Sequence, residues 1–111
     1  MSYFSQLFGN PSKMSAQEAK SIMDSGESYT LLDVRTSDEY RNGHIRGAKS
    51  LPLAQLQQTA ERAIPNKDAK ILIYCASGAR SGNAASMLKN LGYTDVHNFG
   101  GIMSWPYGMI E

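Results

Sequence analysis

Short apolar runs alternate with amphipathic segments along the 111-residue chain. Runs of β-branched, aromatic and other apolar residues without helical spacing predict strands at 29–34, 49–51, 71–74 and 94–99. Apolar residues three or four positions apart predict helices at 16–25, 53–63 and 80–91, and capping residues predict a short helical turn at 36–41. This alternation predicts an α/β fold whose central, mostly parallel sheet is covered by helices on both faces.

The chain has the length of one ordinary domain with a single core. It shows no internal repeat, low-complexity segment or linker that would divide it. Residues 1–13 are polar and aromatic and are interrupted by glycine, asparagine and proline, so we expect an N-terminal leader there. Residues 14–111 are expected to form the domain.

Charge and composition exclude several classes of partner. The net charge is +1 and the basic residues are scattered, which argues against a nucleic-acid partner. No stretch approaches the roughly 20 apolar residues of a spanning helix, and residues 1–13 lack a signal-peptide pattern, so no membrane association is expected. With one cysteine the chain forms no internal disulfide, and a cytoplasmic location is expected by default.

The single cysteine, Cys75, lies where an apolar strand ends and a run of small residues begins. The carboxyl ends of parallel strands are where open α/β sheets bind their ligands. A helix is predicted to start at Arg80, and the small residues between leave room for backbone N–H groups to surround the sulfur. A buried, inert thiol is the alternative, but this setting favours a reactive thiolate.

The side chains near Cys75 allow functional and structural interpretations. The guanidinium of Arg80 is suited to holding an oxyanion, whereas Ser77 and Ser81 fit a sulfur ligand and a structural turn equally well. Asp33 and Arg35 lie at the end of another predicted strand and are interpreted as a structural ion pair. Glu39 is a candidate third member of this ion pair.

The two histidines do not suggest a metal site. His44 lies in a turn and is interpreted as a hydrogen-bonded organiser. One cysteine with His44 and His97 does not match a zinc site in ligand type or spacing, so we expect neither a metal nor a cofactor.

Three blocks in order carry a resemblance to a known family. They are Asp33-Val34-Arg35 with Glu39-Tyr40, Gly43-His44-Ile45, and Gly47-Ala48 before Pro52; then Cys75 to Ser81; then Gly100-Gly101 with Trp105 and Gly108. With these blocks the chain resembles the rhodanese-like domain family in its single-domain form. The resemblance implies a three-layer sandwich around a sheet of about five strands. It also implies a sulfurtransferase of the thiosulfate sulfurtransferase type.

In that family the sulfur is carried as a persulfide on the loop cysteine, which would here be Cys75. The resemblance implies a small sulfur-containing anion such as thiosulfate as donor, and cyanide, a thiol or a protein as acceptor. The implied donor-binding residues follow the cysteine directly: Ala76, Ser77, Gly78, Ala79, Arg80 and Ser81. Ala76 stands where the family often has arginine, so one positive charge near a dianionic donor is missing.

Two other functions fit parts of the same pattern. A cysteine phosphatase or arsenate reductase also uses a thiolate, a backbone cradle and an arginine. Its signature has five residues between cysteine and arginine, whereas four separate Cys75 from Arg80. A non-catalytic binding or regulatory module with the same fold is the second alternative, and Ala76 leaves it open.

Overall fold

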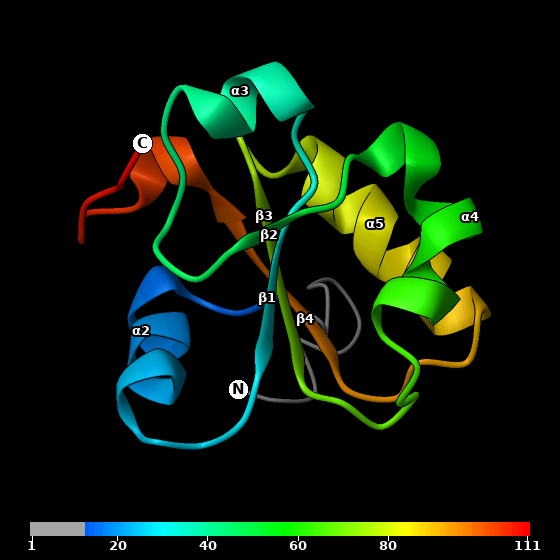
Figure 1. Cartoon of the computed structure of the whole chain (residues 1–111). Helices are drawn as coiled ribbons and strands as arrows, with labels where there is room; N and C mark the ends of the chain where they lie inside the picture. The colour runs from blue at the N-terminus through cyan, green and yellow to red at the C-terminus, as the bar shows by residue number, and fades with distance from the viewer. Residues whose placement is uncertain (1–12) are drawn as a thin grey trace.

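A computed structural model describes residues 13–111 (Figure 1). Its strands form one parallel sheet in the order β2-β1-β3-β4. The strands are β1 (Thr30–Asp33), β2 (Lys49–Ser50), β3 (Ile71–Cys75) and β4 (Val96–Gly101). The parallel sheet expected from the alternating pattern is confirmed, with β3 buried along its whole length.

The described part of the sheet has four strands rather than about five. Beyond β4, Lys13 forms an isolated parallel bridge with Asn98, so the outer edge carries one further backbone pairing. The predicted leader, apart from Lys13, lies outside the described residues.

Two of the helices begin where the sequence supplies side-chain caps. Helix α2 (Ala16–Asp24) starts with a capping box of Ser15 and Glu18, and α3 (Ser37–Arg41) with one of Thr36 and Glu39. The remaining helices are α4 (Leu53–Ala63), α5 (Ala79–Asn90) and the 3₁₀ turn η1 (Ile102–Ser104). No helix between residues 13 and 111 is both long and apolar enough to cross a membrane.

Helices lie on both faces of the sheet, which gives the three layers implied by the family resemblance. Helices α4 and α5 cover one face, while α2 and the C-terminal segment cover the other (Figure 1). Side chains of β3 alternate between the two cores: Ile73 and Cys75 join α4 and α5, and Leu72 and Tyr74 face α2. Cys75 is therefore at the end of the most buried strand, on the side of α5.

Candidate active site

Cys75 is the last residue of β3, and the chain after it curls around its sulfur. The backbone N–H groups of Gly78 and Ser81 donate to Sγ over 2.9 and 3.3 Å. The Ser81 hydroxyl oxygen lies 3.5 Å from the same sulfur. We call residues 75–81 the cysteine loop.

The cysteine loop changes the acidity of the thiol. Burial, the largest single influence, raises the pKa of Cys75, but hydrogen bonds from the Ser81 side chain and from the N–H groups of Ser81, Gly78 and Ser77 outweigh it. The pKa of Cys75 is consequently lowered from its ordinary value. A thiolate is the nucleophilic form of cysteine, so this geometry provides an activated nucleophile.

Glycines at two places allow the cysteine loop to take this shape. Gly78 has φ of +114°, a left-handed conformation that glycine adopts without strain, and it is the residue from which α5 begins. Gly101 packs so closely that a Cβ there would lie 2.1 Å from the carbonyl oxygen of Ala76. The loop therefore rests directly on the backbone of β4.

A bulge in β4 brings Gly101 into position. Ile73 pairs with Asn98 and Cys75 with Gly101, so β4 contains one more residue than β3 between the two pairs. After the bulge, Met103 N–H donates to the Ala76 carbonyl over 3.1 Å, which ties the cysteine loop to η1. The sequence did not indicate what packs against the paired glycines at 100 and 101.

Ser81 is buried beneath the sulfur and has both of the roles that the sequence left open. Its hydroxyl faces Sγ and also lies 3.0 Å from the Gly78 carbonyl, 3.2 Å from Asn98 Oδ1 and 3.3 Å from the Gly100 carbonyl. It thus connects the sulfur with α5 and β4. Sequence reasoning missed Asn98, whose Oδ1 also accepts the N–H of Gly100.

Arg80 contacts a carboxylate rather than pointing freely toward the sulfur. Its two terminal nitrogens bind the carboxylate of Glu39 over 2.7 and 3.1 Å, in a bidentate pair. The hydrogen bonds from Arg80 are the main reason why the pKa of Glu39 falls to about 2. The pair fixes the start of α5 to α3, and an anion-binding role for Arg80 stays a prediction.

The remaining predicted side chains have structural contacts. Arg35 pairs with buried Asp33 over 2.7 Å and donates to the Gly43 carbonyl, which confirms the structural ion pair. Glu39 takes no part in it, because its carboxylate is held by Arg80 and Thr36. His44 stacks on the ring of Tyr40, with centroids 3.7 Å apart, and its Nδ1 lies 2.9 Å from the carbonyl of the same tyrosine.

The other predicted loop residues contribute mainly through their backbone. Ala76 accepts a hydrogen bond from Met103, Ser77 N–H faces the sulfur, and Ala79 is the first residue of α5. Residues 13–111 contain no group of three or more His, Cys, Asp or Glu side chains arranged to hold a metal ion. The site thus consists of one thiol, a ring of N–H groups and a braced loop.

Comparison with known proteins identifies the family of this chain. The rhodanese-like domain model matches residues 15–106. The thiosulfate sulfurtransferase PspE of Escherichia coli is 37% identical over 71 residues, which are 64% of this chain and 68% of PspE.

Solved structures agree with the sequence match. A rhodanese from E. coli, solved with anions, has a TM-score of 0.71 at 31% identity and covers 76% of this chain and 99% of its own. The human single-domain sulfurtransferase TSTD1 has a TM-score of 0.75 at 27% identity, covering 86% and 95%. The chain belongs to the rhodanese-like domain family.

Proposed function

We propose that this protein is a sulfurtransferase that carries a sulfane sulfur as a persulfide on Cys75. The observation that carries the proposal is the cradle itself, in which N–H groups and a hydroxyl converge on one sulfur and lower its pKa. Relatives that are themselves thiosulfate sulfurtransferases support it. A single cysteine needs no oxidising compartment, so a cytoplasmic location is part of the proposal.

The first step is attack by the Cys75 thiolate on the outer sulfur of a donor such as thiosulfate. A new S–S bond forms, the donor's own S–S bond breaks, and sulfite leaves with the bonding electron pair. The product is a Cys75 persulfide whose outer sulfur carries the negative charge. N–H groups of the cysteine loop would stabilise this charge in the way an oxyanion hole stabilises a developing oxygen anion.

In the second step an acceptor nucleophile attacks the outer sulfur of the persulfide. Cyanide would give thiocyanate, and a thiol or a protein cysteine would become a persulfide, while the Cys75 thiolate is regenerated. No external oxidant or reductant is needed, since the sulfur is transferred at constant oxidation state. Both steps require only the thiolate and its hydrogen-bond donors.

The contact of Arg80 with Glu39 argues against phosphate chemistry at the same loop. A cysteine phosphatase needs its arginine to hold the phosphate oxygens, but both terminal nitrogens of Arg80 are already bound to a carboxylate. The short spacing from Cys75 to Arg80 points the same way. No position from Ala76 to Arg80 is an aspartate that would serve as leaving-group acid.

The test compares the wild type with Cys75→Ser in two assays run side by side. We expect the wild type to convert thiosulfate and cyanide to thiocyanate and sulfite, and the variant to lose this turnover. Neither protein should hydrolyse an aryl phosphate. Robust phosphate hydrolysis that Cys75→Ser abolishes would replace the sulfurtransferase proposal with a phosphatase, and inactivity with every sulfane donor would favour a binding module.

A further inference from the structure

A hollow lies on the opposite face of the sheet from α5. It is a cleft of about 420 Å³ between α2, the turn at 45–47 and the C-terminal segment. None of residues 75–81 lines it. Its volume is within the roughly 300–1,000 Å³ range of small-molecule sites, so it is large enough for a ligand of its own.

Aromatic rings form an ordered wall on one side of this cleft. The rings of Trp105 and Tyr107 meet edge to face with centroids 4.9 Å apart, and Phe99 packs behind Trp105 at 5.2 Å. The indole N–H of Trp105 donates to the Gly108 carbonyl over 3.1 Å, which closes the turn that carries both rings. The wall is therefore in place before any ligand binds, which lowers the entropic penalty of binding.

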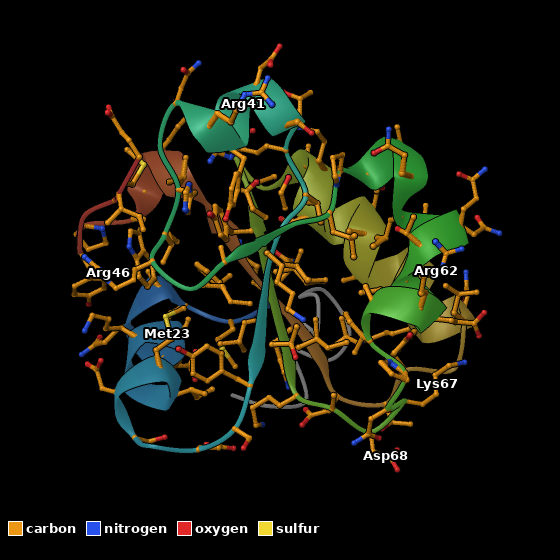
Figure 2. All side chains as sticks on the ribbon, viewed as in Figure 1. Met23, Arg41, Arg46, Arg62, Lys67 and Asp68 are labelled. Carbon is orange, nitrogen blue, oxygen red and sulfur yellow. The ribbon has the colours of Figure 1, made fainter. Side chains whose placement is uncertain are left out.

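Apolar side chains complete the body of the cleft. Met23 from α2 and Ile45 from the turn line it together with the ring of Tyr29. Figure 2 shows Met23 and Arg46 on the same side of the molecule, across from Arg62 on α4. A flat, apolar group would contact carbon atoms on several sides here.

The charges around the cleft leave one cation without a partner. Lys20 is bound to both carboxylate oxygens of Asp24, at 2.9 and 2.7 Å, so these two charges compensate each other. Arg46 is exposed, and among residues 13–111 it has no carboxylate within ion-pair distance. Residues 1–12 contain neither aspartate nor glutamate. The cleft therefore has an excess of one positive charge at its rim.

We propose that this cleft binds a small organic anion that has a flat, apolar body and a single carboxylate or similar group. The body packs against Trp105 and Tyr107, while the anionic group pairs with Arg46, whose planar guanidinium matches a carboxylate. This site is separate from the cysteine loop and does not depend on the proposed sulfur transfer. A guanidinium left free beside preformed aromatic walls is the juxtaposition that carries the proposal.

The test uses the chain's single tryptophan as a reporter located in the cleft. The probe is 3-phenylpropionate, and the Trp105 indole N–H signal is followed by two-dimensional NMR on the full chain. The neutral control is 3-phenylpropionamide, which keeps the ring and loses the charge. We expect a saturable shift with the carboxylate, and we expect the amide to bind at least about fivefold more weakly.

Two arginine variants separate the site from a general charge effect. Arg46→Gln should bind 3-phenylpropionate only as weakly as the wild type binds the amide. Arg62 is an exposed arginine on α4, and Arg62→Gln should bind 3-phenylpropionate like the wild type. Both variants should keep the wild-type melting temperature and sulfur-transfer rate. The proposal is overturned by the absence of a saturable Trp105 shift, by equal binding of acid and amide, or by undiminished binding in Arg46→Gln.

Discussion

Gly101 supports the cysteine loop through a contact that no other residue could make. A Cβ at this position would lie 2.1 Å from the oxygen of Ala76 and 2.6 Å from its carbonyl carbon and from the Cα of Ser77. All three atoms belong to the backbone, so no side chain can rotate away. Gly101→Ala must therefore displace the cysteine loop, β4 or both.

The size of the displacement follows from these distances. Ordinary contacts to a Cβ begin at 3.4 Å, so the Ala76 oxygen would have to move by about 1.3 Å. Overpacking of this kind costs about 1–3 kcal/mol, and losing the hydrogen bond from Met103 to Ala76 adds about 0.5–1.5 kcal/mol. We expect Gly101→Ala to lower the free energy of unfolding by about 1.5–4.5 kcal/mol.

The same movement should disturb the chemistry. The N–H of Gly78, now 2.9 Å from Sγ, follows directly after the displaced residues. A misplacement of about 1 Å at a reacting group can reduce a rate by roughly a hundredfold. We therefore expect kcat/KM for sulfur transfer from thiosulfate to cyanide to fall by about that factor.

Gly82→Ala is the matched control. Gly82 is within α5, close to the same loop, and an added Cβ there would meet nothing within 4 Å. Replacing a helical glycine by alanine should raise stability by roughly 0.5–1 kcal/mol and leave activity unchanged. Circular dichroism melts and initial rates measure both variants. If Gly101→Ala matched the wild type in melting temperature and in kcat/KM, the account of the loop's support would be refuted.

Three further changes test other parts of the molecule. The pKa of Glu39 is lowered to about 2 from its usual 4.5, so its pairing with Arg80 stabilises the fold above pH 4.5, and this stabilisation is lost as pH falls through about 2. At pH 6 the wild type should have a higher melting temperature than Glu39→Gln, and equal melting temperatures would contradict this. Ala76→Arg should lower KM for thiosulfate by about fivefold, because the attraction between one added positive charge and a nearby anion contributes about 1 kcal/mol of binding free energy even in water. An unchanged KM in steady-state kinetics would refute the charge argument. The buried hydroxyl of Ser50 has no hydrogen-bond partner among the described residues. Ser50→Ala should therefore leave the free energy of unfolding in urea unchanged or raise it by up to about 1 kcal/mol. A clear decrease in the free energy of unfolding would contradict this.

Local patterns predicted the elements of the fold well. Apolar spacing predicted a helix at 16–25, where α2 runs from Ala16 to Asp24, and the same spacing from Leu53 to Ala63 gave the bounds of α4. These signals depend on neighbours within four positions along the chain, so the sequence alone is enough to predict where these helices form. The position of Cys75 at a strand's carboxyl end followed from the same kind of pattern.

The features that braced the cysteine loop depend on distant residues. The ion pair of Arg80 and Glu39 joins positions 41 apart, and the sequence alone suggested a free anion ligand and a different partner for Glu39. Strand β4 was expected to end at Phe99, but its pairing with β3 continues past a bulge to Gly101. Sheet register and bulges are fixed by tertiary packing, so periodicity in one strand does not show them.

The number of strands in the described residues also differs from the expectation. A sheet of about five strands was implied by family resemblance, while the described residues form four with an added bridge at Lys13. One residue that pairs with a neighbouring backbone leaves no periodic pattern in the sequence. In the sequence Trp105 was only one of the residues that carry the family resemblance, and the cleft beside its ring was not expected.

The most direct test of the central claim is the mass of the intact protein after incubation with thiosulfate and removal of small molecules. The account predicts that the wild type becomes heavier by one sulfur atom, that cyanide removes this sulfur, and that Cys75→Ala gains none. An adduct of the same mass on Cys75→Ala, or an unmodified wild type with thiosulfate and with other sulfane donors, would contradict a persulfide on Cys75.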